Sequence, residues 1–301
     1  IKYGTASGQY TGTITLGAVT SRTVSGLTNG QAYYFAVRAS NENGESGLSN
    51  ELSATPFVVV PDPDPDPVNG SITLDASSSA QADDVTSLTW THTVGTDSNR
   101  VLVVSAGLRN FGSSDPAPAV STVTYGGQAL TRARREQNDS SSYKVTAETW
   151  YLLNPPSGSH SISVTFNAKV EGISMGAVSL SGVKQQAPEA VAGALGYGKD
   201  ASVTLTTVTN GAWVVDAFVD HYYSSAVSAG AGQTEYYREA NTADQLGAGS
   251  YRPVLQGGPT AMSWTISTAR QWALVAAVFA PADANTAWLP AGTAPSPTRT
   301  G

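Results

Sequence analysis

The chain has 301 residues, a formal net charge of −7 and only 13% charged residues, about half the share that is usual in globular proteins. It has no cysteine, which excludes disulfides, thiolate metal sites and a cysteine nucleophile, and it lacks the basic balance that a nucleic-acid partner would require. The longest apolar run, "WALVAAVFAPA", is much shorter than the roughly 20 residues of a spanning helix, so we expect no membrane span.

Apolar and polar residues alternate with a period of two along most of the chain, and short Gly-, Asn-, Ser- and Pro-rich turns separate these segments. This pattern predicts an all-β protein, and the length allows about two domains. The first predicted domain covers residues 1–56. Within it, "YYFAVRAS" places Tyr33, Phe35, Val37 and Ala39 on one face of a strand.

The stretch "GLTNGQAYYFAVRASNENGESGLSNELSATP" resembles the second half of a fibronectin type III domain. The matching positions are Leu27, Gly30, Tyr33, Phe35, Val37, Ala39, Asn41, Gly44 and Ser46. The resemblance implies a partial immunoglobulin-like sandwich in which the Tyr33 hydroxyl bonds to upstream backbone as a tyrosine corner. Asn29 stands where the family often has Pro, and the first two strands of the family have no counterpart.

Ile1, Lys2 and Tyr3 would then form a strand without its usual neighbours, so we expect an assembly edge there. An exposed strand edge is a template for strand addition, and a strand from another copy could complete the sheet. The apolar residues 57–60 and the C-terminal arm are candidate donors. A chain that is cut or read short at its front is the alternative explanation.

Residues 57–69, within "FVVVPDPDPDPVNG", are predicted to form a stiff linker. Pro fixes φ and pushes the preceding residue into an extended conformation, so Pro61–Pro67 should behave as a polyproline-like spacer. Asp62, Asp64 and Asp66 are a candidate structural Ca²⁺ site. Carboxylates two residues apart point in different directions around such a helix, which favours a plain spacer. No other cofactor is expected.

The second predicted domain covers residues 70–282 and is expected to be a jelly-roll β-sandwich, followed by an extended Pro- and Thr-rich tail at 283–301. The phrases "VTYGGQALT" and "ETWYLLNPPSGSHSISVTF" resemble a module that recurs beside fibronectin type III domains in secreted bacterial proteins. That resemblance implies a secreted or cell-surface location and leaves the function undefined. The candidate strands are 101–108, 121–127, 147–153, 160–166, 174–183, 201–208, 212–223, 261–267 and 272–281.

No catalytic constellation stands out. "GISMG" places Ser174 in a G-x-S-x-G pattern, with Asp216 and His221 as candidate partners, but a strand follows Ser174 where a nucleophile elbow needs a helix. Asp216 and Asp220 would lie about 13 Å apart along one strand face, too far for paired carboxylates, and are interpreted as solvated acids. The three histidines lack zinc-site spacing. We therefore expect neither an enzyme nor a metal site.

Aromatic residues give the only sequence indication of a binding surface. Adjacent strand residues face opposite sides, so one ring of each tyrosine pair should point outward. Such rings bind sugars or proteins, and rim packing is the alternative. The basic segment "TRARREQ", with Arg132, Arg134 and Arg135, is interpreted as a solvated hairpin end. The candidate exposed aromatics are Tyr222, Tyr223, Tyr236, Tyr237 and Tyr251.

These observations favour an extracellular, non-enzymatic structural protein, a subunit of a surface or extracellular filament assembled by strand contacts between subunits. Its partners would be copies of itself or other cell-surface proteins, since contacts made head to tail do not close and therefore produce filaments. The alternative is a carbohydrate-binding or adhesive appendage of a secreted polysaccharide-degrading or cell-surface protein, with a polysaccharide as partner.

Overall fold

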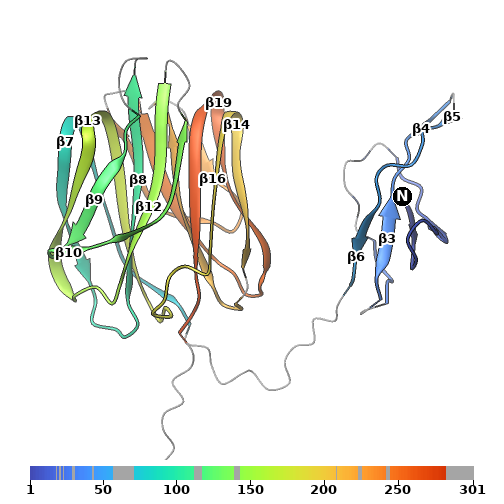
Figure 1. Cartoon of the computed structure of the whole chain (residues 1–301), viewed down its shortest axis with the longest axis horizontal. Coiled ribbons are helices and arrows are strands. Elements are labelled where there is room, and N and C mark those ends of the chain that lie inside the picture. The colour runs from blue at the N-terminus through green and yellow to red at the C-terminus, as the bar shows by residue number, and fades with distance from the viewer. Residues whose placement is uncertain are drawn as a thin grey trace, which may run out of the picture. The chain divides into compact units, whose positions relative to one another are not determined.

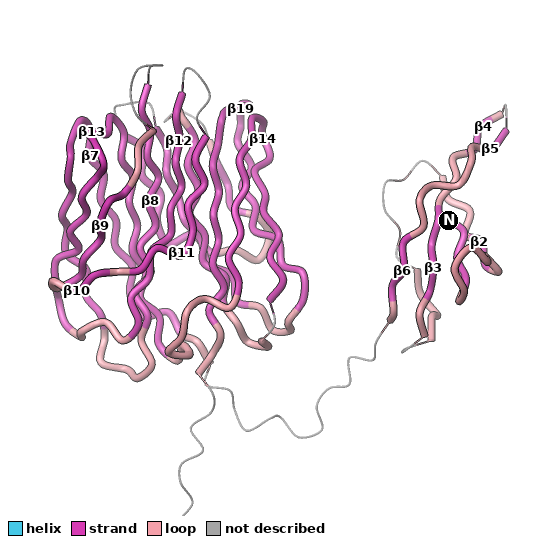
Figure 2. Tube along the Cα trace, viewed as in Figure 1, coloured by secondary structure: helices cyan, strands magenta, loops and turns pink. Residues whose placement is uncertain are grey.

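All regular elements that the structure describes are β-strands, which confirms the predicted all-β class (Figure 2). The computed structural model divides into two compact units, Ile1–Asp66 and Pro67–Gly301 (Figure 1). The predicted linker at 57–69 and tail at 283–301 lie outside the described residues. Those described are residues 1–17, 19, 22, 24–28, 31–42, 44–56, 71–111, 117–138, 143–207, 209–222, 226–241 and 245–282.

The first unit contains a four-stranded antiparallel sheet with the strand order β2-β1-β3-β6. A separate short hairpin joins β4 (Ser40–Asn41) to β5 (Gly44–Glu45). The two edges of the sheet are therefore β2 and β6. The strands of the sheet are β1 (Lys2–Gly4), β2 (Gly12–Thr13), β3 (Tyr33–Ala36) and β6 (Leu52–Ala54).

The expected assembly edge at Ile1, Lys2 and Tyr3 is wrong, because β1 lies inside the sheet between β2 and β3. The chain reverses through a turn that includes Gly8, whose φ of 71° suits glycine. It then returns beside β1, where Ile14 N donates to Ile1 O at 2.8 Å. The free edge on this side of the sheet therefore belongs to β2.

The second unit contains two larger antiparallel sheets. In the first sheet the order is β10-β9-β13-β8-β12-β11, and β7 pairs with β13. In the second sheet the order is β14-β19-β15-β18-β17, and β16 pairs with β19. The strands of the first sheet are β7 (Thr73–Val94), β8 (Val101–Phe111), β9 (Val120–Tyr125), β10 (Gln128–Ala129), β11 (Thr131–Asn138), β12 (Tyr143–Leu153) and β13 (Gly158–Ser181). Those of the second are β14 (Ala190–Thr207), β15 (Trp213–Asp220), β16 (Val227–Ala229), β17 (Thr234–Asn241), β18 (Gln245–Pro253) and β19 (Gly258–Phe279).

Apart from the short strand β10 of the first sheet, the two described sheets have the same connectivity and are two copies of one arrangement. In chain order, β7, β8, β9, β11, β12 and β13 correspond to β14, β15, β16, β17, β18 and β19. A β-bulge interrupts β11 between Arg132 and Arg134, and a bulge interrupts β17 at the corresponding point, between Glu235 and Tyr237. We call β7–β13 the first repeat and β14–β19 the second repeat.

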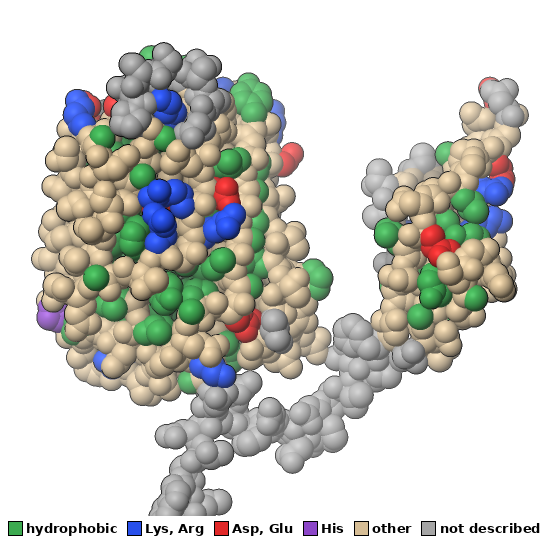
Figure 3. Space-filling model, in the orientation of Figure 1, with side chains coloured by type: hydrophobic (Ala, Val, Ile, Leu, Met, Phe, Trp, Pro, Cys, Tyr) green, Lys and Arg blue, Asp and Glu red, His purple; other side chains and the backbone are tan. Residues whose placement is uncertain are grey.

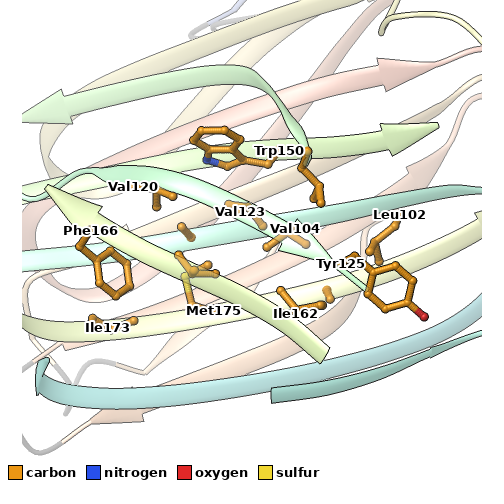
Figure 4. Packing of buried hydrophobic residues seen from close by; sticks show 14 of the residues in the cluster. Leu102, Val104, Val120, Val123, Tyr125, Trp150, Ile162, Phe166, Ile173 and Met175 are labelled. Atoms are coloured by element: carbon orange, nitrogen blue, oxygen red, sulfur yellow. The ribbon is translucent and has the colours of Figure 1, made fainter. Parts of the chain in front are cut away.

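Each repeat folds around a core of its own. In the first repeat, β7 turns back on itself near Asp84, since Ser78 Oγ lies 2.8 Å from His92 Nδ1 on the same strand. β13 bends with it, so that Ile162 and Ile173 from its two halves enter one core (Figure 4). The second repeat builds its core from the same set of strands, with β14 and β19 as the long pair.

A third apolar layer joins the two repeats. β8 packs on β15, β11 lies against β14, and β17 lies against β7. β8 and β15 correspond to each other, and the contact of β11 with β14 corresponds to that of β17 with β7. The repeats are therefore related by an approximate two-fold axis, as in an isologous dimer. From the first repeat this layer takes Val101, Val103, Val145, Ala147, Val178 and Leu180, and from the second Val215, Ala217, Val219, Ala273, Val275, Ala277 and Phe279.

The two described ends of the second unit lie together. Ala282 N donates to Gly182 O at 2.7 Å, and the Gly182 backbone abuts Ser71. We call this the near end. β8 and β15 both run away from it and finish at the opposite end, where the long hairpins also bend. We call that opposite end the distal end.

Candidate functional site

The first candidate site is a groove of about 700 Å³ in the first unit, beside the β2 edge. Its apolar lining includes Val19 and Val37, which are 58% and 51% exposed. Lys2, Arg22 and Arg38 contribute cations, whereas Glu45 is the one carboxylate among the lining residues. The groove thus combines apolar side chains, a cationic rim and a strand edge.

The exposure of Val37 was not expected from the alternation of the segment. The sequence places Val37 on one face with Tyr33, but Tyr33 is 9% exposed and Val37 is half exposed. The reason is that β3 ends at Ala36, so the alternation stops before Val37. Val37 N instead donates to Ser49 Oγ at 3.0 Å.

Tyr33 occupies the interior of the first unit. Its hydroxyl accepts a hydrogen bond from Thr28 N at 3.0 Å, a bond to upstream backbone of the kind the resemblance implies. That bond lowers the pKa of Tyr33, because it stabilises the phenolate. The Tyr3 ring packs on the Tyr33 and Phe35 rings with centroids 6.5 Å and 6.2 Å away.

The second candidate site is a row of rings at the distal end of the second unit. Phe111 and Tyr143 from the first repeat have ring centroids 5.2 Å apart, and Tyr143 lies 4.2 Å from His221 of the second repeat. Tyr222 follows His221 in the chain. We call Phe111, Tyr143, His221 and Tyr222 the distal ring row; it crosses the boundary between the repeats.

Two arginines fix the ends of the distal ring row. The Arg109 guanidinium lies 5.8 Å from the Phe111 centroid, and that of Arg270 lies 4.7 Å from the Tyr222 centroid. Phe111 is 49% exposed, and the other three side chains are partly exposed.

Carboxylates also lie at the distal end. Glu171 lies 3.9 Å from Arg109 and accepts a hydrogen bond from Phe111 N at 2.7 Å. Asp84 pairs with Lys169 at 2.8 Å. Asp220 is fully buried and accepts a hydrogen bond from Tyr222 N at 2.9 Å. Arg109 and Lys169 at the distal end are therefore each next to a carboxylate.

The expected exposure of the tyrosine pairs is wrong for Tyr236 and Tyr237. The bulge in β17 breaks the alternation, so both rings turn inward. The Tyr236 hydroxyl donates to Ser105 Oγ at 2.6 Å across the repeat boundary. Tyr237 is 5% exposed and fills space left by Gly176. Burial raises the pKa of both tyrosines.

The other candidate tyrosines differ from one another. Tyr251 stacks on Trp213 with centroids 4.8 Å apart, which is packing between two strands at the near end. Tyr222 belongs to the distal ring row, and Tyr223 lies outside the described residues. The sequence did not indicate Phe111 or Tyr143, because each stands alone and the row forms only when the two repeats meet.

Asp216 is a fully buried acid, which corrects its interpretation as solvated. Its Oδ1 accepts hydrogen bonds from Ser250 N at 2.6 Å and Ser250 Oγ at 3.0 Å. Its Oδ2 accepts from Trp264 Nε1 at 2.9 Å and Gln233 Nε2 at 3.4 Å. Burial raises the pKa of Asp216 to about 7 even though these donors favour the anion.

The arginines of "TRARREQ" lie on strand β11, not on a solvated hairpin end. Arg135 Nε donates to the fully buried Glu148 at 2.9 Å, and Arg132 lies 3.9 Å from the same carboxylate. Trp150 Nε1 and Val120 N also donate to Glu148, at 3.0 Å and 2.9 Å. Burial raises the pKa of Glu148 against these partners. The cluster stabilises a buried charge.

A serine, a histidine and an aspartate meet near the near end, but not as a catalytic triad. Ser179 Oγ donates to Asp75 Oδ2 at 2.6 Å and lies 3.2 Å from His92 Nε2. In a triad the carboxylate would contact the histidine, whereas here it contacts the serine. Ser179 is 1% exposed, and burial lowers the pKa of His92 to about 4.

Ser174 lies in the middle of β13 and is fully buried, with its hydroxyl directed to Glu239 O at 3.1 Å. No group of three metal-ligating side chains occurs in the part of the chain that the structure describes, and Asp62, Asp64 and Asp66 lie outside it. The described residues also contain no helix capable of crossing a bilayer.

No protein-family model, curated protein or solved structure matches the chain. Function must therefore be inferred from the two candidate sites themselves.

Proposed function

We propose that the chain is an extracellular, non-enzymatic structural protein that assembles through β-strand contacts between copies, with the groove of the first unit as the receiving site. The observation that supports this proposal is the groove of about 700 Å³ beside the β2 edge, with Val19 and Val37 more than half exposed in it. An edge strand next to an apolar groove can take up an added strand, in which backbone bonds give affinity and side-chain pockets give specificity.

The occupant we propose is the segment at 57–66 of a second copy. In sequence, "FVVV" supplies four apolar residues and "PDPDPD" then supplies three carboxylates. The groove offers a complementary set, apolar side chains with three cations and one carboxylate among its lining residues. Opposite charges on the two surfaces favour this partner and speed its encounter.

A second copy fits this role better than the same chain. The segment follows β6, which is the edge of the sheet opposite β2. Three strand spacings separate these edges, about 14 Å. A segment that leaves β6 would have to cross the sheet to reach its own groove. Contacts between copies are heterologous, so they would continue from chain to chain and form a filament.

The extracellular location is part of the same proposal. It is supported by the low charged content and by the resemblance to secreted bacterial modules. Charged side chains are sparse on the face of the second unit that Figure 3 shows. The structure of the second unit, with three apolar layers, suits a rigid spacer in an assembly.

A disulfide test is direct, because the chain has no native cysteine. Two single variants, Val37→Cys and Val59→Cys, are mixed and oxidised; we expect a disulfide-linked dimer on a non-reducing gel. Leu255→Cys, at a residue 86% exposed in the second unit, replaces Val37→Cys in the control and should give no dimer above background.

Sedimentation and electron microscopy of the unmodified chain complete the test. We expect concentration-dependent association that weakens as salt rises, and filaments at high concentration. A chain that stays monomeric and gives no crosslink would overturn the proposal. A crosslink found only within the double variant Val37→Cys/Val59→Cys would overturn the choice of a second copy.

A further inference from the structure

We propose that the distal end of the second unit binds an uncharged polysaccharide chain on the distal ring row, Phe111, Tyr143, His221 and Tyr222. This inference does not depend on the proposed assembly, because it concerns the other unit and other residues.

Three of the four rings are in contact, and these contacts cross the boundary between the repeats. Phe111 and Tyr143 are 5.2 Å apart between centroids, and Tyr143 and His221 are 4.2 Å apart. The axial C–H groups of a pyranose ring form an apolar face that stacks on an aromatic face, so several neighbouring rings suit an extended chain of sugars better than a single sugar. Phe111, 49% exposed, is the most accessible of the four described rings.

The rings are held in place before any ligand arrives. Arg109 lies over Phe111 at 5.8 Å and is itself 7% exposed, and Arg270 lies over Tyr222 at 4.7 Å. His221 Nδ1 accepts a hydrogen bond from Gln271 N at 3.3 Å, which fixes its ring to β19. A platform ordered in advance loses less entropy on binding, which favours affinity.

The charges around the row select an uncharged ligand. Two of the cations at this end already have carboxylate partners, Arg109 with Glu171 at 3.9 Å and Lys169 with Asp84 at 2.8 Å. An anionic polymer would need an excess of cations and would meet these carboxylates.

Hydroxyl groups of a sugar, by contrast, can use both kinds of charged group. The side chains of Lys169 and Asp84 are 61% and 62% exposed, and that of Glu171 is 32% exposed. Together they offer donors and acceptors beside the rings.

The row lies at the opposite end of the second unit from its described chain ends. The chain enters and leaves the second unit at the near end, where Ser71 and Ala282 lie beside Gly182. The distal end is the opposite end of the strands β8 and β15.

The test uses the full chain and its variants in affinity gel electrophoresis with soluble mixed-linkage glucan, xylan and mannan, and in sedimentation with insoluble cellulose and chitin. We expect retention on at least one of these uncharged glycans. Phe111→Ala and Tyr222→Ala should each weaken retention about tenfold, the loss expected when a ring that contacts the ligand is removed.

Leu255→Ala is the matched control, because it removes an exposed apolar side chain from the near end and should leave retention unchanged. Circular dichroism and the urea midpoint of each variant report whether the fold is kept. Phe111→Leu, which keeps an apolar side chain but no ring, separates stacking from simple burial and should also lose retention.

Three results would overturn the inference. They are no retention on any uncharged glycan, equal retention by the wild type and the ring variants, and retention only on anionic polymers such as alginate with loss at high salt. None of them bears on the crosslinking test of the first unit, so the two proposals fail separately.

Discussion

The two repeats of the second unit have the same strand arrangement but fill their cores with different residues. Each core holds one tryptophan whose indole N–H donates to a buried carboxylate. In the first repeat Trp150 donates to Glu148 at 3.0 Å, and in the second Trp264 donates to Asp216 at 2.9 Å. Trp150 lies on β12, whereas Trp264 lies on β19, which corresponds to β13. One backbone arrangement therefore accepts its largest side chain from either of two facing strands.

The residues at corresponding positions show how each core accommodates a tryptophan on a different strand. Counting from the matched ends of the strands, Trp150 corresponds to Ser250 and Trp264 corresponds to Val164. The first repeat therefore combines Trp150 with the smaller Val164, and the second combines Trp264 with the smaller Ser250. Protein interiors are close-packed, so the total side-chain volume of a core is constrained more strongly than the position of each large side chain. The two cores can therefore place their tryptophans on different strands.

The two carboxylates differ in what balances them. Glu148 has Arg135 at 2.9 Å and Arg132 at 3.9 Å. Asp216 is held by the neutral donors Ser250, Gln233 and Trp264, and no ion pair of Asp216 is found in the described part of the chain. Without a cation, burial dominates and brings the pKa of Asp216 to about 7.

The largest effect should come from removing the tryptophans. Trp264→Ala is expected to lower the free energy of unfolding by about 4 kcal/mol, through lost burial and the cavity it leaves. Trp150→Ala should cost a similar amount if the repeats are equivalent. Urea unfolding monitored by circular dichroism measures both. Trp213→Ala, at a partly exposed ring stacked on Tyr251, is the control and should cost less than half as much.

The next effect is the pH dependence of stability that Asp216 contributes. The folded state holds the proton of Asp216 more tightly than the unfolded chain, whose ordinary pKa is 3.8. The resulting stabilisation is therefore complete below about pH 4 and is lost as the pH rises through 7. Between those values it falls by about 1.4 kcal/mol per pH unit.

Asp216→Asn isolates this contribution. The free energy of unfolding is measured by urea titration at pH 5, 6, 7 and 8. From pH 5 to pH 8 it should fall by about 3 kcal/mol more for the wild type than for Asp216→Asn. The pKa of Glu148 is also raised and acts with the same sign, but it is common to both proteins and cancels. Parallel curves for the two proteins would contradict the assignment to Asp216.

A smaller effect should follow from neutralising the first repeat's carboxylate. Glu148→Gln removes the carboxylate that pairs with Arg135, and we expect a loss of about 2 kcal/mol, below the cost for a fully buried pair because Arg135 is 28% exposed. The double variant Glu148→Gln/Arg135→Met should recover part of the loss. A double variant less stable than Glu148→Gln alone would show that Arg135 acts through other contacts.

The strongly apolar strands were predictable from the sequence, and the long strands were not. The predicted strands 101–108 and 147–153 fall within β8 and β12. The predicted strands 160–166 and 174–183 overlap the single strand β13, because backbone pairing continues through the bend between them. β7 was missed, since its Ser-, Ala- and Asp-rich sequence has low strand propensity and forms a strand through pairing along β13.

The duplication itself left a signal in the sequence. "TRARREQN" at 131–138 and "TEYYREAN" at 234–241 share Thr, Arg-Glu and Asn at the same spacing, and they form β11 and β17. Comparing the chain with itself would have found this match. The distal ring row has no such local signal, because it unites residues from the ends of three strands, β8, β12 and β15. The groove depends on where β3 stops, which the alternation pattern does not determine.

The smallest effect concerns the two sides where the repeats touch. On one side Ser79 Oγ donates to Glu239 at 2.6 Å; on the other, the corresponding residue Gly193 lies against Glu136. Gly193→Ala should cost about 1 kcal/mol, because the new methyl group would displace the Glu136 side chain from its pairing with Arg134. Ser79→Ala removes an exposed hydrogen bond and should cost about 0.5 kcal/mol. Equal urea midpoints for wild type and Gly193→Ala would mean that this side is open enough to adjust, and that the two-fold relation does not extend to its edges.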